Sequence, residues 1–173
     1  MKKEKIDFLK MSSKQFDNYM CKTYMEFFGD RRKPMTQTCM CWGFDIGKGW
    51  YETLADLCEM LFYIKRRTGI GVNFVQIKEK YGSGRFYYDI ITSKLYKKLT
   101  KREAKMWQDM ISEIVSRAEE RVYYICAECG KDYFDKISTG WIYDKCGDCL
   151  IKEGKFTKEQ IDDIVKGNKD VDK

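Results

Sequence analysis

The sequence predicts an α+β fold, in which helices pack on a small antiparallel sheet and a Cys₄ zinc ribbon follows at the C-terminal end. Apolar residues recur at helical spacing in three segments, two β-rich runs surround a glycine-bearing turn, and two Cys-x-x-Cys pairs come after the last long segment. We expect an α+β body over residues 1–123, a zinc-ribbon module over 124–151, and a short helix with a frayed tail over 152–173.

The first helix is predicted over about residues 13–28. Ser12 and Gln15 have the spacing of a capping box, which satisfies two backbone N–H groups at a helix start. Gly29 ends the run, and the charged and glycine-containing residues 30–48 predict a loop. The apolar stripe of this helix consists of Phe16, Tyr19, Met20, Thr23, Tyr24 and Phe27.

Two more helices and a hairpin complete the predicted body. A helix is expected over about 51–67, where apolar residues follow helical spacing and the last turn is cationic, which suits the helix dipole. Two β-branched and aromatic runs around the turn at 81–84 predict a β-hairpin over about 72–91. The third helix is expected over about 100–122. Its apolar stripe consists of Met106 or Trp107, Met110, Ile111, Ile114, Val115, Ala118 and Val122.

The strongest motif lies in the last third of the chain. Cys126-x-x-Cys129 is separated by sixteen residues from Cys146-x-x-Cys149, a spacing typical of a tetrahedral Cys₄ zinc site. Such a closed site stabilises structure and leaves no open position for a substrate. We therefore expect one structural Zn²⁺, with two disulfides or four thiols in a core as the alternatives.

Glycines and a helix cap are expected to shape the chain around these cysteines. Gly130 and Gly147 are expected to allow the tight turns of the two cysteine pairs. Further on, Thr157 and Gln160 have the spacing of a second capping box, and Gly167 is expected to end the last helix.

The amino-acid composition limits the classes of enzyme, the partners and the cellular compartment that we expect. The 173 residues contain no histidine, which excludes hydrolases and deaminases that depend on a histidine base or ligand. A net charge of +6, from 33 Lys and Arg against 27 Asp and Glu, is a mild bias toward anionic partners. Since no signal region and no membrane-length apolar run is present, and since eight cysteines suit a reducing compartment, we expect a cytoplasmic protein.

The hairpin and the loop before the second helix are the main candidate ligand sites. Cations beside aromatic rings suit a nucleotide or a single nucleic-acid strand, because the cations contact phosphate and the rings stack on bases. Glycines in the turn would let backbone N–H groups approach an anion. An ordinary turn with core aromatics is the alternative, as is a core position for the tryptophan. The candidate residues are Trp50, Lys78, Lys80, Tyr81, Gly82, Gly84, Arg85 and Tyr87.

Three further sets of residues give weaker indications. A basic run that would contact nucleic-acid phosphates, or form an ordinary solvated face, consists of Lys97, Lys98, Lys101 and Arg102. Four cysteines outside the main motif predict buried thiols, with a second metal site as the alternative: Cys21, Cys39, Cys41 and Cys58. Carboxylates near the candidate loops are able to bind Mg²⁺ but form no distinctive enzyme pattern: Asp45, Glu52, Asp56 and Glu79.

Three blocks of the sequence resemble, in order, those of a widespread family of small uncharacterised bacteriophage proteins. Residues 47–58 are similar to the family's G-D-G-W-[FY]-x-L-I-x-x-L-C block, and residues 75–87 to its Q-V-K-E-K-[FY]-G-x-L-R-F-Y block. Residues 126–149 are similar to its terminal C-x-x-C-G…G-W…C-x-x-C block. Lys48 stands where an acid is usual, and Gly84 where an aliphatic residue is usual. The resemblance implies a phage origin and a fold, but no reaction.

From these observations we expect a non-enzymatic phage accessory protein that acts in the cytoplasm of the host bacterium. It would bind a host or defence component, either a protein or a nucleotide-like ligand, with no membrane partner. A zinc-ribbon regulator that binds nucleic acid is the alternative. A third hypothesis, a carboxylate-dependent enzyme, requires Asp45, Glu52 or Glu79 to converge with Arg85 in one cleft.

Overall fold

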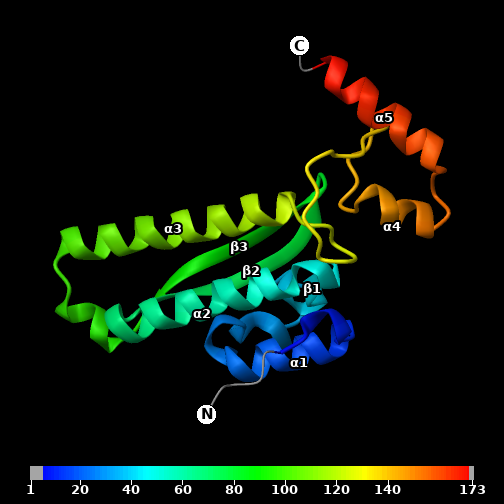
Figure 1. Ribbon diagram of the computed structural model, residues 1–173. Coiled ribbons are helices and arrows are strands. Elements are labelled where there is room, and N and C mark those ends of the chain that lie inside the picture. The colour runs from blue at the N-terminus through cyan, green and yellow to red at the C-terminus, as the bar shows by residue number, and fades with distance from the viewer. Residues whose placement is uncertain (1–5, 172–173) are drawn as a thin grey trace.

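Two antiparallel helices and a β-hairpin form the centre of the molecule (Figure 1). The structure is a computed structural model that describes residues 6–171. Helix α2 (Tyr51–Thr68) leads into strand β2 (Ile70–Lys80), which pairs antiparallel with β3 (Ser83–Thr92). Helix α3 (Lys101–Tyr123) then returns alongside α2 and packs on the hairpin. These elements confirm the predicted helices and hairpin to within two residues at each end.

The hairpin closes through a two-residue turn. Tyr81 and Gly82 have φ values of +54° and +72°, the combination found in type I′ turns, whose twist matches that of the flanking strands. Tyr81 is the only non-glycine residue between 6 and 171 with positive φ. The Gly82 N–H donates a hydrogen bond of 2.6 Å to the Glu79 carboxylate, which satisfies a backbone donor inside the turn.

A short third strand makes the sheet mixed rather than purely antiparallel, which corrects the prediction. Strand β1 (Phe44–Asp45) pairs in parallel with β2, so that the strand order is β1-β2-β3. It lies within residues 30–48, which the sequence predicts as loop. Two residues are too few to show the alternation by which a strand is recognised. A tertiary contact stabilises this strand: the Phe44 ring packs edge-on against the Phe28 ring, with the centroids 5.1 Å apart.

Helix α1 (Ser13–Thr23) begins as predicted and ends early. The capping box is confirmed: the Ser12 N–H donates to the Gln15 side chain at 2.8 Å, and the Gln15 N–H donates back to Ser12 Oγ at 3.3 Å. The helix was expected to continue to residue 28, but a 3₁₀ turn at Met25–Phe27 redirects the chain. Phe28 then stacks on a ring of β2, so burial of aromatics against the sheet outweighs continued helix here.

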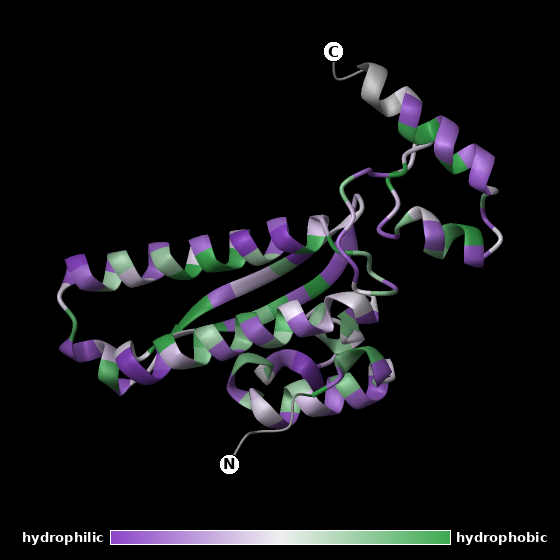
Figure 2. Cartoon of the chain, viewed as in Figure 1, coloured by the Kyte–Doolittle hydropathy of each residue, from purple (hydrophilic) through white to green (hydrophobic). Residues whose placement is uncertain are grey.

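One apolar core joins the body elements, and a much smaller one serves the C-terminal segment. Figure 2 shows the hydrophobic residues of α2 and α3 on the sides that face the hairpin and each other. The largest fully buried side chains include Trp50, Phe16 and Phe74, and the Phe16 ring stacks on Tyr51 at 3.8 Å. A separate cluster near the C-terminus consists of Ile137, Leu150 and Ile161.

The C-terminal segment contains two helices, α4 (Gly147–Lys152) and α5 (Lys158–Val171). The second capping box is confirmed, since the Thr157 N–H donates to the Gln160 side chain at 2.8 Å and the Gln160 N–H donates back to Thr157 Oγ1 at 3.2 Å. The expectation that Gly167 ends the helix is wrong, because α5 continues to Val171. In the loops between α3 and α4, isolated bridges replace regular strands.

Candidate metal centre and binding surfaces

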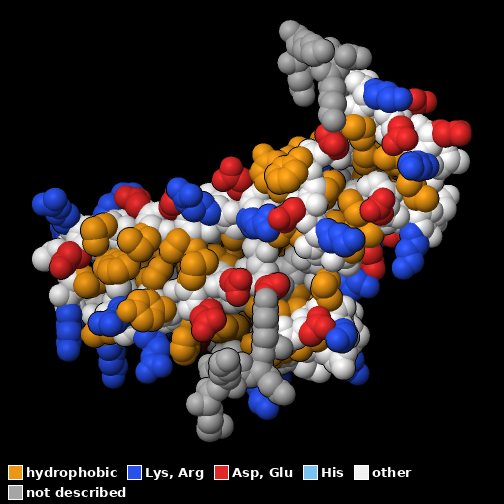
Figure 3. Space-filling view, in the orientation of Figure 1, with side chains coloured by type: hydrophobic (Ala, Val, Ile, Leu, Met, Phe, Trp, Pro, Cys, Tyr) orange, Lys and Arg blue, Asp and Glu red, His pale blue; other side chains and the backbone are white. Residues whose placement is uncertain are grey.

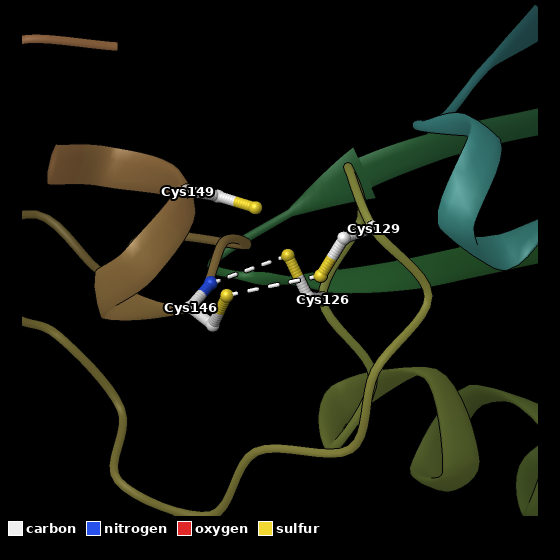
Figure 4. Close-up of side chains that lie close together, drawn as sticks. All are labelled: Cys126, Cys129, Cys146 and Cys149. Atoms are coloured by element: carbon white, nitrogen blue, oxygen red, sulfur yellow. Dashed lines mark hydrogen bonds between the residues drawn. The ribbon is translucent and has the colours of Figure 1, made fainter. Parts of the chain in front are cut away.

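Four cysteine sulfurs meet where the C-terminal module joins the body (Figure 4). Cys126 and Cys129 follow α3, Cys146 precedes α4, and Cys149 in the first turn of α4 points its sulfur toward the others. All four Sγ atoms lie within 4.8 Å of one another, and those of Cys129 and Cys146 are 3.8 Å apart. Thiolates bound to one Zn²⁺ at about 2.3 Å would lie about 3.8 Å apart in a tetrahedron. The cluster therefore has the size of a four-thiolate metal site.

Backbone N–H groups favour negative charge at the most buried sulfur. The Cys146 N–H donates to Cys126 Sγ at 3.3 Å. Burial opposes ionisation of Cys126, but hydrogen bonds from the N–H groups of Cys129, Cys146 and Glu128 lower the pKa of its thiol. Burial and the neighbouring Cys126 together raise the pKa of Cys146 to about 11. A bound cation would remove this repulsion between thiolates and allow all four to act as ligands.

The two glycines beside the cysteines have different roles. Gly130 has φ of +70°, as expected for a tight turn after the first pair. Gly147 has no such conformation. It is the first residue of α4, and a Cβ atom there would lie 2.8 Å from the Ile161 side chain. Its small size therefore allows α5 to pack closely, and the expected turn at this position is wrong.

The loop from Gly47 to Trp50 holds the first cysteine pair against the body. The Gly49 N–H donates to the Ala127 carbonyl at 2.7 Å, and Trp50 Nε1 donates to the Ile125 carbonyl at 2.7 Å. A Cβ atom at Gly49 would lie only 2.1 Å from the Cys126 carbonyl oxygen. Trp50 is fully buried, so its place among the candidate ligand-binding residues is corrected to a core position. The alternative weighed for this tryptophan is confirmed.

The hairpin tip forms a second contact with the module, through Lys136. The Lys136 ammonium lies 4.2 and 4.4 Å from the ring centroids of Tyr123 and Tyr133 and donates to the Gly82 carbonyl at 3.0 Å. Burial lowers the pKa of Lys136 to about 8, against the opposing influence of Asp144. A partly buried cation thus joins the turn of the hairpin to the loops that carry the cysteines.

One face of the hairpin gathers most of the predicted ligand-binding residues. Lys78 lies directly opposite Arg85, and Tyr87 lies two residues further along β3 on the same face. The Lys78 ammonium is 5.6 Å from the Tyr87 ring, and that of Lys80 is 5.1 Å from the Tyr81 ring. Cations and rings are therefore brought together at the surface, as predicted.

The glycines of the hairpin do not belong to that face. Gly82 is buried against Ile142, and both its backbone polar groups are already bonded, to Glu79 and Lys136. Gly84 is buried against Val122. Neither N–H lies open to a ligand, and both glycines are corrected to packing positions.

The basic run lies at the opposite end of the molecule from the cysteines. Lys97 and Lys98 belong to the 3₁₀ turn Lys94–Lys98, and Lys101 and Arg102 lie in the first turn of α3, all of them exposed. They flank the cationic C-terminus of α2.

The carboxylates of the enzyme hypothesis do not form one cluster. Asp45 is paired with Lys78 in the β1–β2 register, which places it two strand spacings, about 10 Å, from Arg85. Glu79 alternates to the other face of β2, and Glu52 lies on α2. Within residues 6–171, the only group of three or more candidate metal ligands is the cysteine cluster.

The remaining four cysteines were predicted to be buried thiols, and this is only partly confirmed. Cys58 is completely buried, and burial holds the pKa of its thiol well above the ordinary value. Cys21 is half-buried, which raises its pKa to about 11. Cys39 is exposed, and the Cys41 thiol contacts the Thr38 carbonyl. In the described part of the chain they form no second metal cluster.

An apolar surface on α2 and α3 was not predicted from the sequence. Figure 3 shows hydrophobic side chains gathered between these two helices. Met60 and Tyr63 of α2 are 46% and 60% exposed, and Met106 and Met110 of α3 are 51% and 41% exposed. We call this surface the α2–α3 groove. Together with the partly buried Trp107 and Ile114, its residues are Met60, Tyr63, Met106 and Met110.

The methionines of α3 correct the predicted apolar stripe. Ile111, Val115 and Val122 face the core as predicted, and of the alternatives Met106 and Trp107 it is Trp107 that packs against the core. Met110 was placed in the stripe and is exposed instead. A signal was present in the sequence, since Met106, Met110 and Ile114 form a second apolar row at i, i+4 and i+8, too wide for a single buried stripe.

Comparison of the chain with protein-family models, with curated proteins and with solved structures gave no match. None of the described helices is long and apolar enough to cross a membrane.

Proposed function

We propose that the protein is a non-enzymatic accessory protein that binds a partner protein through the α2–α3 groove. The observation that carries this proposal is the exposure of Met60 and Tyr63 on α2 and of Met106 and Met110 on α3, two helices that pack against each other. Large contiguous apolar patches are uncommon on proteins that act alone, and they mark interaction sites. Methionine and aromatic side chains are also favoured at protein interfaces.

A structural Zn²⁺ is the second part of the proposal. Four sulfur ligands in a tetrahedral arrangement suit Zn²⁺, whereas Mg²⁺ and Ca²⁺ prefer oxygen. With all four positions taken by protein, the ion would hold the module together and contact no substrate. The metal would therefore stabilise the module, and the body that carries the binding surface would rely on its own apolar core.

A phage origin is the third part, and the resemblance of three sequence blocks to bacteriophage proteins supports it. In that setting the partner would be a host or defence protein in the cytoplasm of the infected bacterium. A nucleotide-like ligand on the hairpin face is a second candidate, favoured by the shared face of Lys78, Arg85 and Tyr87. We rank it lower because that face lacks the open glycine N–H groups expected of an anion site.

Partner capture with matched variants tests the proposal. Tagged protein is expressed in bacteria as wild type, as Met60→Asp/Met110→Asp, and as the control Met25→Asp/Met35→Asp, whose methionines are 74% and 66% exposed outside the groove. Wild type and control should retain the same protein, and the groove variant should lose it at least tenfold, since interface anchors each contribute about 1–2 kcal/mol. Equal retention by all three proteins would overturn the proposal, as would metal-dependent turnover of nucleotides or nucleic acid.

A further inference from the structure

The α2–α3 groove has the length and the depth to take a helix. The 18 residues of α2 extend about 27 Å, or five turns. Near the module the surface is hollowed by a cavity of about 450 Å³, lined by residues of both helices that include Thr53, Met60, Ile114 and Ala118. Beyond it, Figure 3 shows hydrophobic side chains that continue toward the far end, and the exposed apolar residues of the two helices include Tyr63, Met106 and Met110.

Methionine is well suited to line such a groove. Its unbranched side chain adapts to the shape of a ligand, and helix-binding grooves of other proteins use this property. An amphipathic helix would place side chains at i, i+3, i+4 and i+7 along the floor. Burial of these chains would cover the apolar surface that the structure leaves in contact with water.

The far end of the groove is strongly cationic. Among the described residues, no carboxylate pairs with any of the six cations there, while other cations of α3 do have such partners, as in Lys105–Asp109, Arg117–Glu113 and Arg121–Asp132. Two of the six lie instead over aromatic rings, Arg66 over Phe62 and Arg67 over Tyr63. The six are Arg66, Arg67, Lys97, Lys98, Lys101 and Arg102.

Helix polarity affects the two groups of cations differently. The C-terminus of α2 compensates Arg66 and Arg67, whereas the N-terminus of α3 does not compensate its cations. Lys101 and Arg102 lie in the first turn of α3, where the exposed N–H groups of the helix already carry partial positive charge. Cations are unfavourable in that position, and an acidic partner would compensate them. The charge at this end therefore points to an anionic group of the ligand, next to an apolar surface.

We propose that the groove binds an amphipathic helix of the partner protein whose acidic residues lie at the end next to Lys94–Lys98. This inference rests on the proposed function and adds the chemistry and the direction of the partner. Apolar side chains of the helix would contact Met60, Met106 and Met110. Its carboxylates would form ion pairs with the six cations that have no carboxylate partner among the described residues. A nucleic acid would use the cations and leave the methionines uncovered, so the apolar floor favours a helix.

Peptide binding followed at the methionine methyl groups tests this inference. The probe is a synthetic 18-residue helical peptide with leucines on one face and three glutamates at one end. The matched probe has lysines in place of the glutamates. Signals of ¹³C-methyl methionine should shift for Met60, Met106 and Met110 and stay in place for Met25 and Met35. The glutamate peptide should bind at least tenfold more tightly than the lysine peptide.

Two charge-reversal variants test the role of the cations, one at the groove and a matched control elsewhere. Lys97→Glu/Lys98→Glu/Arg102→Glu should abolish the preference for the glutamate peptide. Lys14→Glu/Lys22→Glu/Lys152→Glu, which changes three exposed or surface cations elsewhere and reaches the same net charge, should keep it. Equal affinity of the two peptides for wild type would overturn the inference, as would methyl shifts outside the groove.

Two other occupants have distinct signatures that would also overturn the inference. A second copy of the chain would broaden the groove methyl signals as protein concentration rises, together with a doubling of mass in sedimentation. A DNA duplex that binds equally well to wild type and to Met60→Asp/Met110→Asp would assign the cations to nucleic acid. If the groove variant loses its captured partner while both peptides bind equally, the proposed function stands and only the acidic helix fails.

Discussion

The body and the C-terminal module are stabilised in different ways. The body has one continuous apolar core. Its buried residues extend in sequence from Phe16 to Ala127 and include aromatic rings of α1, α2, β2 and β3. The module has only a small cluster around Leu150 and the four cysteines. A segment with so little apolar burial needs another source of stability, and metal ligation supplies it in small domains. The body should therefore fold without metal, and the module should not.

The largest expected effect is the loss of one of the four proposed metal ligands. Cys149→Ser should unfold the module, because binding of a structural Zn²⁺ contributes about 10–16 kcal/mol in small zinc domains. Hydrogen exchange measured by mass spectrometry should show lost protection over residues 124–167 and retained protection in β2 and α3. The exposed Cys39→Ser is the control and should change neither region. Unfolding of the whole chain by Cys149→Ser would contradict the division into two regions.

The next effect concerns the contact between the regions. Gly49→Ala should destabilise the protein by about 1–3 kcal/mol, because the added Cβ would lie 2.1 Å from the Cys126 carbonyl. The variant should also bind metal more weakly, since the first cysteine pair is displaced from the body. Urea unfolding and competition with a zinc chelator measure these two effects.

Gly167→Ala is the matched control for that experiment. Nothing lies within 4 Å of a Cβ at Gly167, which belongs to α5. This substitution should stabilise α5 by up to about 1 kcal/mol, because alanine favours helix over glycine. Equal destabilisation by both substitutions would show that the close approach at Gly49 is not the cause.

Sequence patterns predicted the features that local chemistry determines. The capping boxes of Ser12 and Thr157, the hairpin and the spacing of the cysteines all depend on residues close together in the chain. Features that depend on distant contacts were missed or misplaced. Strand β1 exists through its pairing with Ile77, and the Gly49–Trp50 segment acts as a docking site for a loop 75 residues away.

The candidate binding surface shows the same limit. Met110 has the same apolar character as Ile111, so composition alone does not tell which of the two faces the core. Only the position of α2 beside α3 determines that one is buried and the other lines a groove. The hairpin cations were easier to foresee, because strand alternation places Lys78 and Lys80 on one face whatever packs behind them.

A smaller, pH-dependent effect is expected at the second contact between the regions. Burial lowers the pKa of Lys136 to about 8 from an ordinary value of 10.5, so between these values the unfolded chain binds more protons than the folded protein. Stability contributed by this lysine therefore rises as pH increases from 8 toward 10. Allowing for solvent screening of a partly exposed group, wild type should gain about 1–2 kcal/mol relative to Lys136→Met.

Urea unfolding of both proteins at pH 7 and pH 9.5 measures this difference. The comparison with Lys136→Met cancels other groups that titrate in this range, such as the buried Cys58 thiol. A constant gap between the two proteins would contradict the shifted pKa. Loss of protection confined to the hairpin tip and the loop around Tyr133 would place the effect at the contact itself.

The smallest effect compares the same interaction in the two regions. Ser12 and Thr157 cap α1 and α5 with nearly equal bonds, of 3.3 and 3.2 Å to the N–H three residues on. Ser12→Ala should lower the free energy of unfolding of the whole body by about 1 kcal/mol, because α1 packs into the main core. Thr157→Ala should weaken hydrogen-exchange protection only in α5, which projects from the body (Figure 1) and packs on the small cluster through Ile161. If both substitutions lowered global stability equally, body and module would unfold as one cooperative unit, and the metal would stabilise the groove directly.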